Sequence, residues 1–568
     1  MKSYFPFLNW MSSYNKKDLN GDISAGLTVG VMLIPQGMAY SMLAGLPPIY
    51  GLYASTIPLI IYALFGTSRQ LAVGPVAMVA LLISSGVGAI AAIGSEDFIS
   101  LAILLALMVG VIQFAMGAFR LGFLVNFLSH PVIAGFTSAA ALIIGFSQLK
   151  HLFGVNIPRG KVHETIMHLF EQIGDTNWYT FAVGAGAIVI LLLIKKFAKK
   201  VPGPLIAVFL SILVVVVFGL DELGVSIVGD VPGGLPSFSA PAWSMDSMKA
   251  LLPTALAISF VGFMESIAVA KAIQAKHKNY QVVPNQELIG LGLANILGSF
   301  FKAFPVTGGF SRTAVNDQAG ARTGLASIIS AVLIILTLLF LTEYFYFLPK
   351  AVLASIIFVA VFGLIDIKEA KHLWATDKRD FALFMITAIA TLILGIEEGI
   401  LIGVAISLIY VIYHVSYPHV ATLGKVPGSR SYRNVNRFDN LEQWDDILII
   451  RFDAQLYFAN TTYFRTYIDK AIARKPNTKH LILDFKAINN LDSTAVHALH
   501  DLLLEYQENG IQIHFVEVKG PVRDIMKRNH LFELAGPEKF YVTIDDAIHQ
   551  ITGTEKQETG TYATQSNI

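Results

Sequence analysis

Two short stretches interrupt the long hydrophobic runs that fill the first 416 residues, and both carry residues able to bind an anion. The stretches are LAVGPVAMVALL, with Gly74, Pro75 and Val76, and FPVTGGFSRTAVN, with Gly309, Phe310, Ser311 and Arg312. Glycine and proline end a helix or begin a new one, and the free N–H groups at a helix start attract anions. The pattern predicts short helices starting at about Gly74 and Gly309, with Arg312 adding a permanent charge.

Three further polar residues lie inside hydrophobic segments. Glu265, in FMESIAVAK, is an ionisable residue within a predicted span, and such residues usually serve function and have a partner. Arg312 is the partner we expect: protonation of Glu265 would release Arg312 toward an anion, although a purely structural ion pair is the alternative. Gln36 and Tyr40 are four residues apart, so they share a helix face and can donate hydrogen bonds to an anion or to a neighbouring helix.

Composition identifies the environment in which these residues must act. Of 568 residues, 54% are hydrophobic and 14% are charged, whereas soluble domains carry about 25% charged residues. The net charge of +1 gives no indication of nucleic-acid binding, and the absence of cysteine excludes thiol chemistry. We find no P-loop and no close histidine pattern for a metal. The chain is therefore predicted to be a membrane protein, with no enzymatic activity, cofactor or metal.

The hydrophobic segments organise the chain into a membrane part and a tail. We predict an N-terminal cytoplasmic segment (1–21), a transmembrane domain (22–416), a linker and start of the tail (417–445), a soluble domain (446–552) and a disordered tail (553–568). The fourteen predicted spans are 22–45, 48–66, 74–92, 98–118, 125–148, 178–195, 204–219, 250–272, 285–301, 308–320, 322–342, 349–365, 380–395 and 397–416. An excess of Lys and Arg in alternate loops places both termini in the cytoplasm.

The two sets of seven spans resemble each other. FLSHPVIA in the fifth span matches FLPKAVLA in the twelfth, and each half has a polar residue followed by a Gly/Pro break at a similar distance. Because seven is odd, the halves must cross the membrane in opposite directions. Interrupted segments at matching positions of inverted repeats indicate a transporter's binding site. The symmetry predicts two helix N-termini that face each other near the midplane.

These motifs, with NQELIGLGLANILGSF and PVTGGFSRTAVNDQAGARTGLA, resemble the SulP family of sulfate permeases, related to solute carrier family 26. The resemblance implies a polytopic helical fold of seven plus seven inverted spans, with a core and a gate domain, as in nucleobase transporters. It implies alternating access and family binding positions at Gln36, Tyr40, Gly74, Pro75, Val76, Glu265, Ser311 and Arg312. It also implies secondary active transport of an inorganic anion, with sulfate and proton coupling favoured. The alternatives are a bicarbonate, chloride or dicarboxylate transporter or exchanger, an anion channel and a nucleobase carrier.

The tail alternates strand and helix patterns, which predicts an α/β domain. LILDF…INNLDSTAVHAL resembles the STAS domain, in which Asp492 and Ser493 are expected to cap a helix. In regulatory relatives the serine at the Ser493 position is phosphorylated. The resemblance further implies homodimers in an inner or plasma membrane, with the lipid bilayer around the spans and the STAS domain in the cytoplasm.

Overall fold

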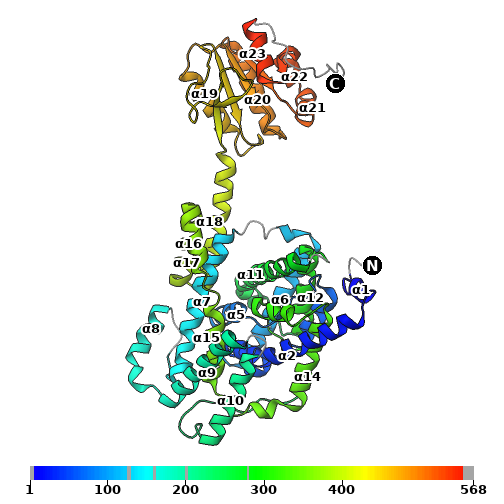
Figure 1. Cartoon of the computed structure of the whole chain (residues 1–568), viewed down its shortest axis with the longest axis vertical. Coiled ribbons are helices and arrows are strands. Elements are labelled where there is room, and N and C mark those ends of the chain that lie inside the picture. Colours follow the sequence, from blue (N-terminus) through cyan, green and yellow to red (C-terminus); the bar gives the residue numbers. More distant parts are fainter. Residues whose placement is uncertain (1–4, 124–128, 158–161, 199–201, 278–279, 554–568) are drawn as a thin grey trace. The chain divides into compact units, whose positions relative to one another are not determined.

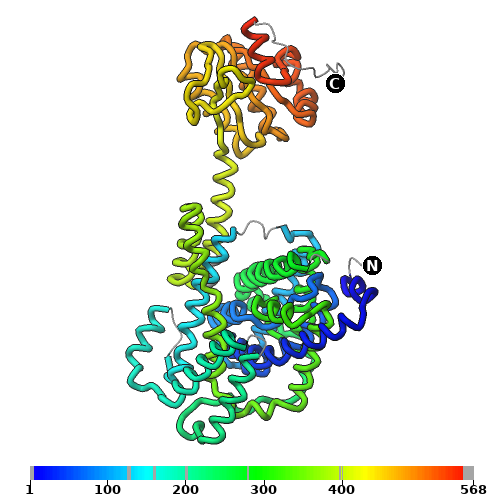
Figure 2. The backbone as a smooth tube through the Cα atoms, in the orientation of Figure 1, coloured from blue at the N-terminus to red at the C-terminus, as the bar shows by residue number. Residues whose placement is uncertain are grey.

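The computed structural model describes residues 5–123, 129–157, 162–198, 202–277 and 280–553. The chain divides into two compact units, Met1–Leu408 and Ile409–Ile568, which are considered separately (Figures 1 and 2). Parts of the sequence-based interpretation lie outside the described residues: the tail 554–568, residues 1–4, and the loop lysines Lys199, Lys200 and Lys278.

The first half of the membrane unit follows the predicted spans closely. Its elements are α2 (Lys16–Ala44), α3 (Pro48–Tyr53) with α4 (Ile57–Phe65), β1 (Val73–Gly74) with α5 (Ala77–Gly88), α6 (Glu96–Ala118), α7 (His130–Phe153), α9 (Trp178–Phe197) and α10 (Gly203–Phe218), with short helices α1 (Phe7–Met11) and α8 (Val162–Glu171). The N-terminal segment expected at 1–21 thus contains α1 and the first residues of α2, whose start is capped by the Asn15 side chain.

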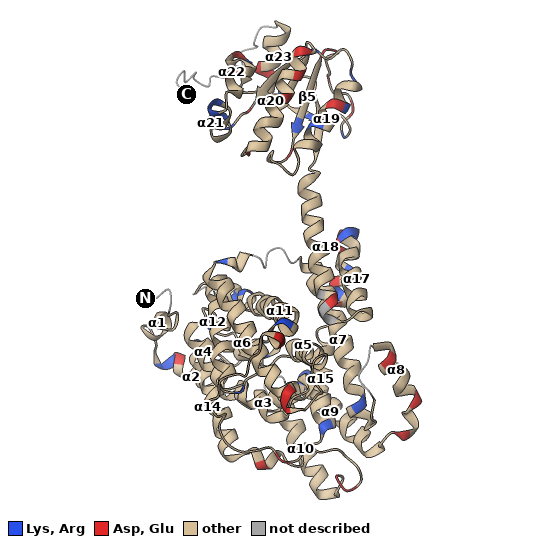
Figure 3. Cartoon of the chain, turned by 180° about the vertical axis from the view of Figure 1, so that it is seen from behind, with Lys and Arg blue, Asp and Glu red and all other residues tan. Residues whose placement is uncertain are grey.

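The second half repeats this pattern. Its elements are α11 (Met245–His277), α12 (Pro284–Ser299), β2 (Thr307–Gly308) with α13 (Phe310–Gln318), α14 (Leu325–Phe340), α15 (Lys350–Phe362), α16 (Ile367–Thr376), α17 (Lys378–Ile393) and α18 (Ile396–Ser416). Among the described residues, seven helical segments have the length and composition to cross a membrane, and four others are shorter apolar helices. Charged residues are sparse along these helices (Figure 3). The shortest spans include the interrupted ones, which agrees with the predicted breaks.

Contacts between helices define two groups. In the first, α6 packs against α12 and α2 packs against α14; in the second, α7 and α9 pack against α15, and α7 also packs against α17. Small residues permit the close approach in the first group. A Cβ on Gly110 would lie 2.6 Å from the backbone nitrogen of Ile296, and one on Gly26 would lie 2.7 Å from the carbonyl oxygen of Ala326. These groups correspond to the predicted core and gate domains.

Two buried carboxylates join elements that are far apart in the core group. Asp22 accepts hydrogen bonds from the backbone N–H groups of Arg322 and Thr323, at 2.7 and 2.9 Å. Glu287 accepts from the Tyr62 hydroxyl at 2.5 Å and from the backbone N–H of Thr67 at 2.6 Å. Both residues are 0% exposed, so removing their partners would leave a buried charge unsatisfied. The carboxylates thus fix the loops that flank the two interrupted spans.

The C-terminal unit is an α/β domain with a six-stranded sheet in the order β4-β3-β5-β6-β7-β8. Its elements are β3 (Val420–Lys425), β4 (Tyr432–Asn434), β5 (Ile447–Phe452), α19 (Thr461–Ala473), β6 (His480–Asp484), α20 (Ser493–Glu508), β7 (Gln512–Val516), α21 (Gly520–Arg528), α22 (Leu531–Ala535), β8 (Phe540–Tyr541) and α23 (Ile544–Thr552). Strands β5 to β8 pair in parallel, and β3 pairs antiparallel with β5. The segment expected as a linker and start of the tail therefore contributes two strands, β3 and β4.

Candidate functional site

The two interrupted spans meet through a small antiparallel sheet. Val73 lies opposite Gly308 and Gly74 lies opposite Thr307, so the two breaks are paired backbone to backbone. The Gly309 N–H also donates to the Ala72 carbonyl at 3.2 Å. Helix α5 then begins after its N-cap Val76, and α13 begins after its N-cap Gly309. The structure therefore brings the two predicted helix starts together, although the first begins at Ala77 because Val73 and Gly74 belong to the strand.

Buried polar side chains of α11 and α12 form hydrogen bonds with this small sheet and with the residue before it. The Asn295 side chain of α12 accepts from the Val306 N–H at 2.8 Å and donates to the Val306 carbonyl at 3.0 Å. Ser266 of α11 accepts from the Gly308 N–H at 2.8 Å and lies 2.7 Å from the Thr307 hydroxyl. Sequence reasoning assigned no role to Asn295 or Ser266. The signals for these positions in the sequence are the polar amide within LGLANILG and the serine beside Glu265.

Arg312 lies between the two breaks. One nitrogen of its guanidinium, Nη1, donates to the Pro75 carbonyl, and the side chain is 2% exposed. Its other two nitrogens, Nε and Nη2, are buried and have no hydrogen-bond partner among the described residues. A Cβ added to Gly309 would lie 3.1 Å from Nη2, and one on Gly74 would lie 3.4 Å from it. The glycines thus make room for a cation that retains donors for another group.

A cavity of about 160 Å³ adjoins the guanidinium. Its lining includes most of the residues selected from sequence, namely Gln36, Tyr40, Val76, Glu265, Gly309, Phe310, Ser311 and Arg312. Gly74 and Pro75 are not among its lining residues, and the Pro75 carbonyl accepts from the Arg312 guanidinium instead. Phe136, Phe260 and Val404 supply apolar walls that sequence reasoning did not identify. The cavity is smaller than the roughly 300–1,000 Å³ of sites for drug-sized molecules, which suits a small ion.

Glu265 and Arg312 face this cavity but do not form the ion pair expected from sequence. No described acid lies within 4.0 Å of the Arg312 nitrogens, and the guanidinium donates to a backbone carbonyl instead. The Gln36 side-chain oxygen is also buried and has no partner among the described residues. A cation with two unpartnered nitrogens, a buried amide and a carboxyl group therefore share one small cavity.

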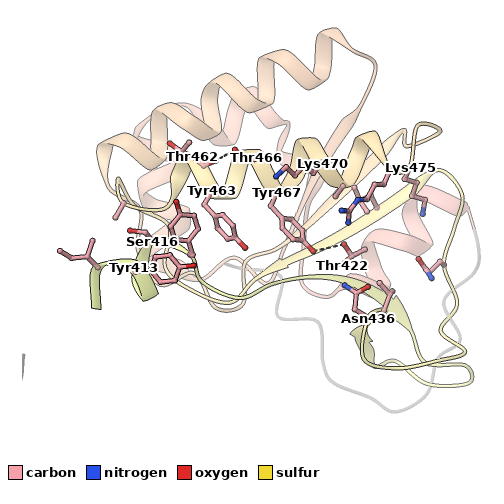
Figure 4. Close-up of a pocket in the computed structure, with 18 of the residues that line it drawn as sticks. Tyr413, Ser416, Thr422, Asn436, Thr462, Tyr463, Thr466, Tyr467, Lys470 and Lys475 are labelled. Carbon is pink, nitrogen blue, oxygen red and sulfur yellow. Dashed lines mark hydrogen bonds between the residues drawn. The ribbon is translucent and has the colours of Figure 1, made fainter. Parts of the chain in front are cut away.

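The C-terminal unit has a separate, larger cavity of about 1140 Å³ that sequence reasoning did not predict (Figure 4). Tyr413, Tyr463, Tyr467 and Lys475 are among its lining residues, and the Thr422 and Tyr467 hydroxyls lie 3.4 Å apart. The Lys475 ammonium already donates to the Ile447 carbonyl at 2.8 Å and to the Trp444 carbonyl. This lysine therefore stabilises the domain rather than presenting its charge to a ligand.

Helix α20 begins as the sequence indicates, with one difference. The Asp492 side chain is the N-cap and accepts from the Ala495 N–H at 2.8 Å, while Ser493 is the first residue of the helix. Asp492 also accepts from the Phe458 N–H at 2.9 Å. The Ser493 side chain does not cap the helix, and it is exposed.

The fold defines a polytopic helical membrane transporter of the inverted-repeat type, with a C-terminal STAS domain. The chain belongs to the sulfate permease family: the family's profile matches residues 19–387, and the STAS profile matches residues 440–547. It is 43% identical over 564 residues to Sulfate transporter 4.1, chloroplastic, of Arabidopsis thaliana, covering 96% of this chain and 82% of that one. It is 35% identical to High affinity sulfate transporter 2 of Stylosanthes hamata, covering 96% and 86%.

Solved structures agree with this fold. The chain matches the murine Solute Carrier 26 family member A9 anion transporter in the inward-facing state with a TM-score of 0.90 and 28% identity, covering 97% of this chain and 94% of that one. The transmembrane domain of a cyanobacterium bicarbonate transporter matches with a TM-score of 0.60 over 70% of this chain and 98% of that chain, at 23% identity. The predicted helical fold, with its seven-plus-seven inverted arrangement and STAS domain, is therefore confirmed. The family is one of permeases rather than of enzymes.

Proposed function

We propose that this protein is a secondary active transporter of inorganic anions, with sulfate as its substrate and a proton as the coupled ion. The observation that carries the proposal is the buried Arg312 guanidinium, which has two unpartnered nitrogens beside a small cavity at two helix starts. The relatives named as sulfate transporters support the choice of sulfate. The substrate-binding residues we propose are Gln36, Tyr40, Gly74, Pro75, Val76, Gly309, Phe310, Ser311 and Arg312.

Binding in this site follows from simple electrostatics. The first turns of α5 and α13 have N–H groups without helical partners, and their dipoles are positive at these ends. Arg312 adds a full charge and two donors in a planar fork, which suits the oxygens of an oxyanion. Gln36 and Tyr40 lie on the same face of α2 and complete the lining with groups able to donate. A divalent tetrahedral anion would use more of these donors than chloride would.

Coupling to protons follows from the charge of the cavity. When Glu265 is ionised, its charge cancels that of Arg312, and a dianion would enter a site that is neutral overall. When Glu265 is protonated, the same anion meets a net charge of +1. Proton and anion therefore favour each other's binding, and by linkage the effect is reciprocal. Glu265 is the coupling residue in this proposal.

The remaining parts of the proposal concern the whole transporter. The core carries α5 and α13 and moves against the gate, which exposes the site alternately to each side of an inner or plasma membrane. Both termini and the STAS domain lie in the cytoplasm, with domain limits at 1–21, 22–416, 417–445, 446–552 and 553–568. Two copies form a homodimer, and Ser493 is a site of regulatory phosphorylation.

The direct test is uptake of radiolabelled sulfate into proteoliposomes with and without an inward proton gradient. We expect the gradient to drive accumulation by the wild-type protein. Glu265→Gln should remove this dependence while sulfate binding persists, because the neutral amide imitates the protonated carboxyl. Glu222→Gln, at an exposed acid outside the cavity, is the matched control.

Two results would contradict the proposal. If sulfate uptake is not saturable and bicarbonate or chloride is taken up, sulfate is not the substrate. Full gradient dependence in Glu265→Gln would remove Glu265 from the coupling mechanism.

A further inference from the structure

A second cavity lies in the membrane unit, at the helix ends that the proposed topology places on the outer side. It measures about 590 Å³ and is lined by the last turns of α2, α5 and α7, the start of α8, the first turns of α15 and the end of α17. We call it the outer vestibule. It is distinct from the site cavity, whose lining on α15 begins only at Ala360, whereas the vestibule lining on α15 runs from Lys350 to Ile357.

The outer vestibule ends about one helical turn from the anion site on three helices. On α2 the site is lined by Tyr40 and the vestibule by Leu43. On α5 the corresponding residues are Met78 and Leu81, three apart in sequence, which is nearly one turn. Only a thin layer of mainly apolar side chains therefore separates the two spaces. An ion held in the outer vestibule would be the next to reach Arg312 when this layer opens.

The charges lining the outer vestibule favour an anion. Among the described residues, its lining contains Lys150 and Lys350, one on each of two gate helices, and one acid, Glu164. These described side chains carry one more positive than negative charge. An excess of positive charge in a recess with low-dielectric walls raises the local concentration of anions.

Lys350 occupies a position that helix stability does not explain. It is the first residue of α15, where a positive charge opposes the helix dipole. The start of this helix is fixed by backbone bonds, from the Lys350 N–H to the Ser226 carbonyl at 2.9 Å and from the Val228 N–H to the Leu348 carbonyl at 2.8 Å. No acid among the described residues lies within 4.0 Å of the Lys350 ammonium.

The corresponding residue of the other repeat behaves differently. His130, which aligns with Lys350 in the FLSHPVIA and FLPKAVLA motifs, is also the first residue of its helix, α7. Its ring lies 3.2 Å from the Glu369 carboxylate, so a partner within the protein accounts for it. Lys350, in contrast, lies at the start of a helix, where anions are favoured, and its side chain lines the outer vestibule.

We propose that the outer vestibule is a second, transient site for small inorganic oxyanions, with Lys350 as its anchoring cation. This inference rests on the proposed anion transport. The vestibule collects the anion from the outside before the midplane site binds it, so it sets the apparent affinity from that side and leaves the maximal rate of transport almost unchanged.

The test compares Lys350→Gln with Lys249→Gln, at an exposed lysine near the start of α11 that does not line the vestibule. Labelled sulfate uptake is measured with the full-length protein in intact cells and in inverted vesicles from the same cells. We expect Lys350→Gln to raise KM about two- to five-fold for uptake into cells, as for the loss of one partly exposed ion contact. For Lys350→Gln, kcat and the KM in inverted vesicles should stay near wild type. For Lys249→Gln, the KM and kcat should stay near wild type from both sides.

Ionic strength gives a second readout that a structural role would not produce. The difference between wild type and Lys350→Gln should shrink as potassium gluconate is raised, because exposed charges are screened. Lys350→Arg should keep the wild-type KM, and thermal unfolding of each purified variant reports whether it folds.

An equal change in KM from both sides, or a change that salt does not reduce, would overturn the vestibule site while leaving anion transport intact. Absence of sulfate uptake by the wild type would instead refute the proposed function. The two failures are therefore distinguishable.

Discussion

At the scale of single residues, Arg312 carries most of the argument. A positive charge in a membrane protein often extends to the interface. The structure shows the side chain 2% exposed, with Nη1 bound to the Pro75 carbonyl. The charge therefore stays inside the domain. Its other two nitrogens have no partner among the described residues, so the Pro75 bond compensates only part of the desolvation of this cation, and the proposed anion would supply the remaining partners.

Replacing Arg312 should separate the contribution of its charge from that of its shape. Hydrogen bonds to charged groups contribute about 1.5–3 kcal/mol, so Arg312→Ala should weaken sulfate binding roughly 10- to 150-fold. Arg312→Lys keeps the charge but loses the planar fork, and we expect an intermediate affinity. Isothermal titration calorimetry of the purified protein with sulfate measures both.

Arg322→Ala, at an exposed arginine ten residues further along the chain, is the control and should bind as wild type. An unchanged dissociation constant in Arg312→Ala would show that the guanidinium does not contact the substrate.

At the scale of elements, the two breaks were predictable, but the contacts that join them were not. Gly74, Pro75 and Gly309 mark the breaks by residue type alone, and the facing helix starts follow from the inverted repeat. The strands β1 and β2 are two residues each, too short to show a periodic pattern. The Asn295 and Val306 bonds, and the approach of Glu287 to Thr67 across 220 positions, depend on tertiary packing. The sequence therefore indicated where the site lies, whereas the hydrogen bonds that stabilise it could be identified only from the structure.

Gly309 tests whether this close packing matters for function. A Cβ at this position would lie 3.1 Å from Arg312 Nη2 and 3.2 Å from a methyl group of Val76, so Gly309→Ala must displace one of them. Overpacking costs about 1–3 kcal/mol, and we expect roughly ten-fold weaker sulfate binding in titration calorimetry.

Gly186→Ala on α9 is the matched control, because no atom lies within 4 Å of the added Cβ. We expect it to bind sulfate as wild type and to unfold at the same or a slightly higher temperature, since alanine favours a helix over glycine. Equal sulfate affinity in both variants would mean that the Gly309 position tolerates a side chain and that the guanidinium is not held in place by this contact.

At the scale of the whole molecule, sequence predicted two units of different character, and composition was sufficient for that. Charge density rises near Tyr417, and alternating strand and helix patterns follow. The strands β3 and β4 were missed because their segment is polar and short, as a linker would be. The pairing of β3 with β5 becomes evident only in the structure. The C-terminal unit also contains two neighbouring histidines, one of them buried, that no local pattern reveals.

This pair should make the C-terminal unit sensitive to acid. His514 on β7 is 3% exposed, and its Nε2 lies 3.1 Å from Nδ1 of His480. Burial, followed by the nearby His480 and Lys539, lowers the pKa of His514 to about 4 from its ordinary value of 6.5. Below pH 6.5 the unfolded chain takes up a proton that the folded domain refuses, so stability is complete above pH 6.5 and falls as the pH approaches 4. The full loss is on the order of 3 kcal/mol.

Hydrogen–deuterium exchange of the full-length protein, followed in peptides covering β6 and β7, measures this effect. We expect protection to fall from pH 7 to pH 5 in the wild type and to fall less in His514→Gln, because glutamine does not titrate. Comparing variants at each pH cancels the intrinsic dependence of exchange on pH. His497→Gln, at an exposed histidine on α20, should behave as wild type. If His514→Gln and the wild type lose protection equally, the acid sensitivity of this sheet does not come from its buried histidine.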